Sequence, residues 1–299
     1  MTPPDRPRLV LLIGAHKTAS SHLQQSIMAA EPALRDHSVA PVPPQVMRDH
    51  LDPIAHMLRD GAQLPEARQA AQDFLQKQAP GADRVVMMNE NILGRTDPKS
   101  LLRARRLYPW APRRLLWVVD LFPDHDIDIG LAIRNLATFL PSCWGENLFH
   151  KPYVDFDTYM GGIDPTDLSW ARLLRRLRDT ASRAQIFVWR YEDYTALMPH
   201  LCDRILGDRA AVHVTPLDKV MRLCFSAAAA AHLEAMEAPT NDDIHAARKA
   251  HSKADGAAPF RPWSQEQRAA LDARYATDLK ALSRIENLDL LQAPGTSDA

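Results

Sequence analysis

Short apolar runs alternate with longer amphipathic stretches along the chain, and this alternation predicts parallel strands separated by helices. The apolar runs are residues 9–13, 85–88 and 186–189, while residues 127–133 alternate apolar with smaller or polar side chains. Runs of this length are typical of strands buried on both faces of a sheet. We therefore predict a three-layer α/β fold, a central parallel sheet with helices on both faces.

Helical spacing of apolar residues fills the intervals between these strands. Leu23 and Ile27 lie four apart after the first strand, and Ser20 or Ser21 is the expected N-cap of that helix. Further helices are predicted over residues 46–59, 65–78, 113–122, 165–180 and 264–285.

Three other segments are predicted to be irregular. Residues 40–44 are proline-rich and predict a turn, and the polar residues 241–263 predict a surface loop or a flap over the site. Residues 291–299 predict a disordered tail. The sequence shows no repeat and no boundary, so residues 1–299 are interpreted as one domain with a core over about 8–285.

The composition excludes several classes of protein. A formal net charge of −1 gives no basic field for nucleic acid, so any anion site must be local. The three cysteines, Cys143, Cys202 and Cys224, are widely spaced and predict reduced thiols rather than a metal site. No apolar run is long enough to span a bilayer, and we expect a cytoplasmic protein without a transmembrane segment.

The segment after the first apolar run combines a glycine, a lysine and hydroxyl residues. Gly14 permits a tight turn, and Lys17, Thr18, Ser20 and Ser21 follow before the helix. Backbone N–H groups at a helix N-terminus attract anions, and the lysine adds a full positive charge. This pattern predicts a phosphate site.

The loop is not a Walker A motif, which needs a glycine directly before the lysine and another five residues earlier. His16 and Leu11 take those places. The loop resembles instead the 5′-phosphosulfate loop of the sulfotransferase family, roughly I-G-x-x-K-T-G-T-T-x-L-Q. The matching residues are Ile13, Gly14, Lys17, Thr18, Leu23 and Gln24, while Ser20 and Ser21 replace the two threonines and keep the hydroxyls.

Ala19 stands where that motif has its last glycine. If the backbone has a positive φ there, alanine is strained by about 1 kcal/mol or more, which would affect the affinity for nucleotide. The resemblance assigns cofactor binding to Gly14, Lys17, Thr18, Ala19, Ser20 and Ser21.

Charged residues follow the other predicted strands directly. Glu90 comes after one strand, Arg134 after the next, and Arg190 and Glu192 after a third. Because ligands of open parallel sheets bind at the carboxyl ends of the strands, we expect these groups to share one edge with the Lys17 loop. For Glu192, the alternative interpretation is a structural role.

Arg134 carries the second resemblance to the sulfotransferases. Members of that family bind the 3′-phosphate of their donor with an arginine at a strand end and a serine eight residues later, and Ser142 has this spacing. Trp144 matches an aromatic residue two positions further on. Pro141 predicts a kink in this helix or a late start. A structural ion pair is the alternative for Arg134.

The resemblance implies transfer of a sulfuryl group from 3′-phosphoadenosine-5′-phosphosulfate (PAPS), without a metal, to a hydroxyl or amine of a small-molecule or carbohydrate acceptor. Lys17 would stabilise the charge that develops on the leaving phosphate. Glu90 is the expected general base, and His16 is its rival.

The alternatives are a P-loop nucleotide kinase or NTPase, and a catalytically silent nucleotide-binding protein of the same fold. Glu90 could merely orient Lys17, and His16 could merely shape the turn. The sequence leaves the acceptor and the oligomeric state open.

Overall fold

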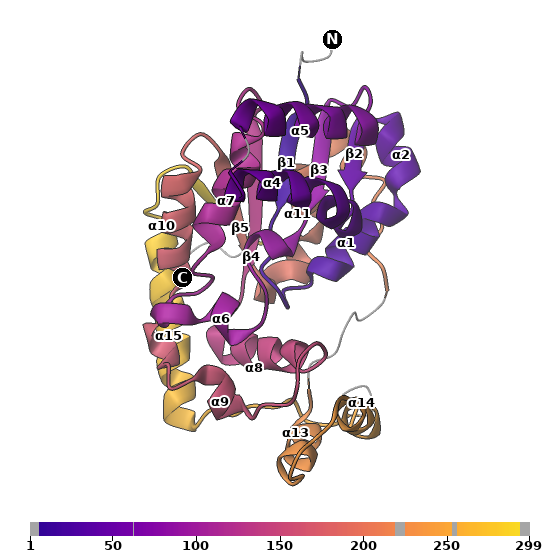
Figure 1. Ribbon diagram of the computed structural model, residues 1–299. Coiled ribbons are helices and arrows are strands. Elements are labelled where there is room, and N and C mark those ends of the chain that lie inside the picture. The colour runs from indigo at the N-terminus through magenta and orange to yellow at the C-terminus, as the bar shows by residue number, and fades with distance from the viewer. Residues whose placement is uncertain (1–5, 62, 219–224, 253–255, 294–299) are drawn as a thin grey trace.

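Six parallel strands form one sheet in the order β2-β3-β1-β4-β5-β6 in the computed structural model, which describes residues 6–61, 63–218, 225–252 and 256–293 (Figure 1). The strands are β1 (Arg8–Leu12), β2 (Val39–Val42), β3 (Arg84–Met88), β4 (Ile127–Ile133), β5 (Gln185–Arg190) and β6 (Leu288–Leu291). The predicted fold class is confirmed.

The helices connect the strands and cover the sheet. They are α1 (Ser20–Ala29), α2 (Glu31–Asp36), α3 (Pro44–Val46), a π-helix (Met47–Leu51), α4 (Asp52–Arg59), α5 (Leu64–Gln78), α6 (Pro98–Leu101), α7 (Ala111–Asp120), α8 (Leu136–Asn147), α9 (Phe156–Met160), α10 (Trp170–Thr180), α11 (Tyr194–Leu206), α12 (Asp208–Ala211), α13 (Ala227–Glu234), α14 (Asn241–Ala250) and α15 (Gln265–Leu282). Short 3₁₀ turns are η2 (Glu90–Ile92), η3 (Arg103–Arg105), η4 (Pro165–Asp167) and η5 (Tyr191–Asp193).

Alternation along β1 builds both layers of the core. Leu9 and Leu11 join one apolar cluster with residues of α5, α7, α8 and α10. Val10 joins a second cluster on the other face, with residues of α1, α2 and α11. Successive side chains of a strand point to opposite faces, so five apolar residues in a row require helices on both sides.

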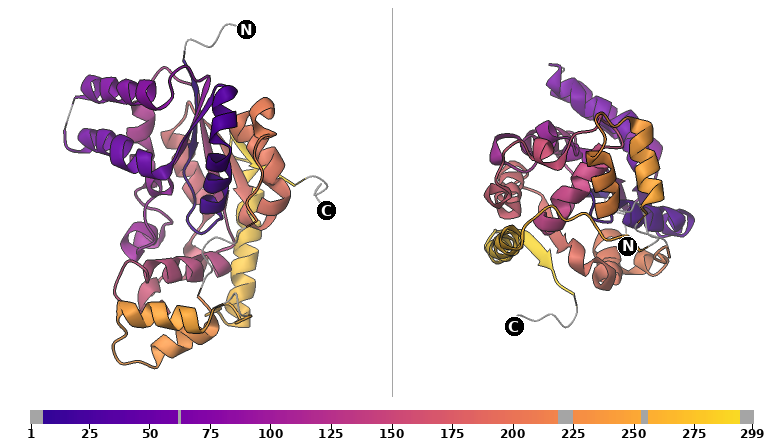
Figure 2. Two further views of the ribbon diagram at one scale, coloured as in Figure 1. Left: turned by 90° about the vertical axis from the view of Figure 1, so that its right-hand side faces the viewer. Right: turned by 90° about the horizontal axis from the view of Figure 1, so that it is seen from below.

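The helices α8, α9, α13 and α14 lie beyond the sheet, on the side toward which β4 runs into α8 (Figure 1 and Figure 2). Phe225 and Leu233 of this region belong to the same apolar cluster as Leu9. The carboxyl edge of the sheet therefore faces this group of helices, and the candidate site lies between them.

Two predictions of irregular structure are wrong. Residues 40–44 contribute to β2 and α3 rather than to a turn. β2 is the edge strand of the sheet, and an edge strand tolerates Pro41 because one side of its backbone has no neighbour to pair with.

Residues 241–250 form α14, so the predicted loop is wrong for this segment. The helix begins with a capping box in which Thr240 and Asp243 bond each other's backbone N–H groups, a signal present in the sequence. Lys253 of the predicted flap lies outside the described residues. The strand β6 was not predicted, and it extends to Leu291; residues 294–299 of the predicted tail are not described.

Two helix starts also differ from expectation. The N-cap of α1 is Ala19 without any side-chain cap, so Ser20 and Ser21 lie in the first turn instead of capping it. Helix α8 starts at Leu136, capped by Asn135, and continues through Pro141 to Asn147; the prediction of a late start is therefore wrong.

Cys143 and Cys202 are buried and belong to no disulfide, while Cys224 lies outside the described residues. Over the part of the chain that the structure describes, no helix is both long and apolar enough to cross a membrane.

Candidate functional site

A cleft of about 1090 Å³ opens at the carboxyl ends of the central strands, and its lining includes residues of α8. Among the residues that line it are eight candidates from the sequence: His16, Lys17, Ala19, Ser20, Ser21, Glu90, Arg134 and Ser142. Gly14 and Thr18 do not line the cleft. The topology brings these groups together because β1 lies between β3 and β4, where the chain changes direction across the sheet.

The loop between β1 and α1 needs unusual backbone conformations. Gly14 has φ 114°, and a Cβ atom there would lie 3.2 Å from the Cβ of Glu90, so a glycine lets this loop pass close to η2. Lys17 and Ala19 also have positive φ values, 58° and 64°. The left-handed conformation that would strain Ala19 is therefore present.

Lys17 forms an ion pair with Glu146 of α8, at 3.0 Å between Nζ and Oε2. Both side chains are nearly buried, 10% and 9% exposed. His150, one turn further along, lies 3.7 Å from the other oxygen of Glu146. The carboxylate fixes the position of the lysine ammonium group at the cleft wall.

Arg134 connects the end of β4 with the Lys17 loop. Its Nη1 donates to the carbonyl oxygen of Lys17 at 2.7 Å, and its Nε donates to the Thr138 hydroxyl at 2.9 Å. The guanidinium group lies over the ring of Tyr191 at 4.3 Å. Three neighbours therefore hold a 9% exposed arginine in one orientation beside the loop.

The first turn of α1 offers free donors to the cleft. No described residue accepts a hydrogen bond from the backbone N–H of Ser20 or Ser21, and both residues line the cleft. Thr18 is buried instead, and its hydroxyl donates to the Ala15 carbonyl at 2.7 Å. The side chain of Thr18 thus braces the loop.

His16 is held by Tyr108, whose hydroxyl lies 2.9 Å from Nδ1 and also accepts from the His16 backbone N–H. Burial lowers the pKa of His16, although Glu90 and Glu146 act in the opposite direction. The imidazole is thus favoured in its neutral form, which can accept a proton.

Glu90 follows β3 and faces the cleft from η2, with Gln24 of α1 donating to its Oε2 at 3.1 Å. Ser142 lines the cleft from α8. Trp144 does not: it is fully buried in the apolar core, and its Nε1 donates to the Val154 carbonyl. Glu192 accepts hydrogen bonds from the Asn135 N–H and the Tyr275 hydroxyl, which fits its structural interpretation.

Sequence reasoning missed Glu146, although a signal was present. Ser142 and Glu146 are four residues apart and lie on one face of α8, and Ser142 was already a candidate; His150 follows four residues later, just after the helix ends. Arg48 and Arg95, two further cations of the cleft, had no such signal because both lie outside the strand ends.

No protein-family model matches this chain, and no curated protein matches it either. Among solved structures, the chain is similar to a sulfotransferase from Alicyclobacillus acidocaldarius, with 14% identity, 96% of this chain and 98% of that chain covered, and a TM-score of 0.44. At such a distance, function has to be argued from this chain's own residues.

Proposed function

We propose that the protein is a sulfotransferase that moves a sulfuryl group from PAPS to a hydroxyl or amine. The observation that carries the proposal is the direct bond between Arg134 and the carbonyl of Lys17 at the wall of one cleft. Two cations that the sequence separates by more than a hundred residues form one unit there, as a donor with two phosphate groups requires.

The donors left free in this unit match the chemistry of such a ligand. The N–H groups of Ser20 and Ser21 have no acceptor among the described residues, and Nη2 of Arg134 donates to none of them. Charge-assisted hydrogen bonds to a phosphate would satisfy all three groups. In the proposal, Lys17 and the turn of α1 bind the 5′-phosphate, and Arg134 with Ser142 binds the 3′-phosphate.

Transfer then needs one bond to form and one to break. The acceptor oxygen attacks sulfur, the bond from sulfur to the 5′-phosphate oxygen breaks, and the acceptor proton passes to a base. Lys17 stabilises the charge that grows on the leaving phosphate oxygen, where a fixed ammonium group acts without reorganisation.

Glu90 is the proposed base, and His16 is its rival, since both line the cleft. The two roles separate by substitution: Glu90→Gln should abolish transfer and preserve nucleotide binding, while His16→Asn preserves both. The reverse result would assign the base to His16.

Thermal-shift titration with adenosine 3′,5′-bisphosphate, AMP and ATP–Mg²⁺ tests the proposal. A larger shift with the bisphosphate than with AMP is expected, because only the former carries the 3′-phosphate. A shift that requires ATP and Mg²⁺ would favour the kinase or NTPase alternative. A bisphosphate shift without turnover on a panel of acceptors would favour the silent binding protein.

A further inference from the structure

Helix α7 presents aromatic and basic residues where an amphipathic helix usually presents scattered polar ones. Trp110 at its N-cap, Arg113, Arg114 and Trp117 have the spacing i, i+3, i+4 and i+7, which places them on one face. The opposite face carries the buried Leu115, Val118 and Val119 and packs on the core.

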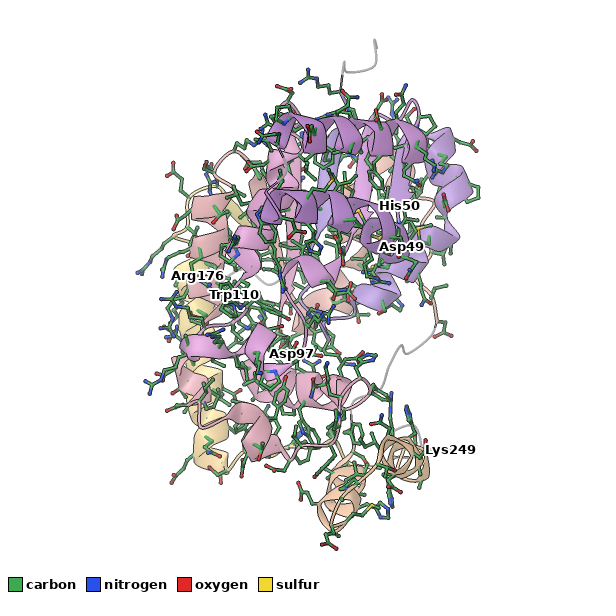
Figure 3. All side chains as sticks on the ribbon, viewed as in Figure 1. Asp49, His50, Asp97, Trp110, Arg176 and Lys249 are labelled. Atoms are coloured by element: carbon green, nitrogen blue, oxygen red, sulfur yellow. The ribbon has the colours of Figure 1, made fainter. Side chains whose placement is uncertain are left out.

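This face lines a second pocket of about 450 Å³, which Arg95 and Asp97 complete from the loop before α6. Figure 3 labels two of its lining residues, Asp97 and Trp110. Arg95 and Asp97 also line the main cleft, so the two spaces are neighbours that share a wall.

The arginines of this pocket lack acceptors. Within the described ranges, Arg95, Arg113 and Arg114 form no ion pair and donate no hydrogen bond; Arg113 lies over the Trp117 ring at 5.1 Å. Arg114 is only partly exposed and packs beside Gly94, where an added Cβ atom would lie 3.2 Å from its Nη1.

The nearby carboxylates are engaged elsewhere. Asp97 caps α6 by accepting from the Ser100 N–H at 3.1 Å. Asp52, which interacts electrostatically with Arg114, accepts from the Asn89 amide with both oxygens at 3.0 Å. Burial lowers the pKa of Arg114 and the charge of Arg95 adds to this effect, while Asp97 and Asp52 act in the opposite direction. An anion placed between the two arginines would supply the acceptor that both lack.

We propose that the second pocket binds the carboxylate or sulfate group of a ring-shaped anionic acceptor while the acceptor's hydroxyl reaches the main cleft. The arginines bind the anion, and Trp110, which is 44% exposed, and Trp117 provide apolar walls for the ring that carries it. This inference rests on the proposed function, because it names the acceptor class for that reaction.

A matched pair of probes tests the pocket without any transfer reaction. Benzyl glucuronide and benzyl glucoside differ only at C6 of the sugar, which is a carboxylate in the first and a hydroxymethyl group in the second. Calorimetry on the full chain without nucleotide measures both affinities. We expect the glucuronide to bind at least about tenfold more tightly, since hydrogen bonds to charged groups are strong. Equal affinities, or no binding of either probe, would overturn the proposal.

Variants then locate the binding. Arg114→Gln should remove most of the preference for the glucuronide, and Arg95→Gln, an exposed residue whose loss cannot unfold the core, should reduce it severalfold. Arg209→Gln removes the same charge from an exposed site on α12 and should leave the preference intact. An unchanged preference in both pocket variants would refute the pocket as the site.

Benzoate distinguishes the source of the anion. If benzoate binds as tightly as the glucuronide, the pocket recognises an aromatic acid. If benzoate binds more weakly, the pocket recognises an acidic sugar. Either result supports an anion pocket. Failure of the proposed function appears separately, as loss of the bisphosphate shift while the glucuronide preference remains.

Discussion

Two pairs of cations in the adjoining cleft and pocket, Lys17 with Arg134 and Arg95 with Arg114, are held in opposite ways. In the cleft, Lys17 has Glu146, and Arg134 has the Lys17 carbonyl and Thr138 as fixed partners. In the pocket, Arg95 and Arg114 have no acceptor among the residues that the structure describes. The two groups of cations thus lie in adjacent spaces with different degrees of preorganisation.

This difference bears on what each space can recognise. A cation fixed by partners keeps one geometry and loses little side-chain entropy when a ligand binds, which suits one invariant group such as a phosphate. An arginine without partners adapts to anions of several shapes, and exposure makes its binding sensitive to salt. Raising the salt concentration should therefore weaken the glucuronide more than the bisphosphate.

Lys17→Met breaks the ion pair with Glu146 and should have the largest effect on activity and stability. It removes the ammonium group that would stabilise the charge on the leaving phosphate, so transfer should fall at least about tenfold. It also takes the lysine ammonium group away from the nearly buried Glu146 carboxylate, which should lower the free energy of unfolding by about 3 kcal/mol. Urea denaturation and initial rates measure the two losses.

The double variant Lys17→Met with Glu146→Gln is the matched control for that loss. Neutralising Glu146 removes the carboxylate charge that Lys17 balances in the native protein, so stability should largely return while bisphosphate binding stays weak. Recovery of wild-type nucleotide affinity in the double variant would show that Lys17 acts only as the partner of Glu146.

Arg134→Gln tests the second fixed cation. Bisphosphate affinity should fall at least about tenfold, because a charged donor is lost together with its bond to the Lys17 carbonyl. Thr138→Val keeps the charge and removes only one positioning bond, so a loss of less than about threefold is expected. Calorimetric titration with the bisphosphate compares the two variants. Equal losses of affinity would make Arg134 a positioning residue rather than a residue that binds the phosphate.

The pH dependence of stability probes His16. Because burial lowers the pKa of His16, the unfolded chain binds a proton at a higher pH than the folded protein. The stability that neutral, buried His16 allows is fully present above its ordinary pKa of 6.5. This stability is lost as pH falls from 6.5 toward the lower pKa of the folded protein. Urea denaturation across this pH range should show that the free energy of unfolding falls less steeply with decreasing pH in His16→Gln than in the wild type. The difference in slope should be up to about 1.4 kcal/mol per pH unit. His125, whose pKa burial also lowers, remains in both proteins, so an identical decline would refute the effect.

The inner strands of the sheet can be predicted from local sequence patterns, whereas the edge strands β2 and β6 cannot. Of the four inner strands, β1, β3 and β5 contain apolar runs, which only a doubly covered sheet can bury, and β4 shows strand alternation. β2 contains Pro41, and β6 is short and only partly buried, so neither has a periodic signal. Their pairing depends on neighbouring strands that sequence reasoning does not supply.

The residues of the candidate site show the same distinction between local sequence pattern and tertiary packing. Residues at strand ends, such as Glu90 and Arg134, were predicted because parallel strands end at one edge. Glu146 reaches Lys17 from a helix, and Arg114 reaches its pocket from a helix face. Such contacts depend on how α7 and α8 pack against the sheet, which no local pattern encodes.

Ala19→Gly is the smallest expected effect and tests whether the loop of the main cleft is strained. Ala19 has φ 64°, a conformation that costs alanine about 1 kcal/mol and glycine almost nothing. The variant should be more stable by roughly 0.5–1 kcal/mol, because glycine's greater freedom in the unfolded chain offsets part of the relief. Ala29→Gly, at the exposed last residue of α1, should be less stable by a similar amount. If both variants lost stability in urea denaturation, the alanine in the loop would be unstrained, and the cleft would owe its fixed geometry to the Lys17 and Arg134 contacts alone.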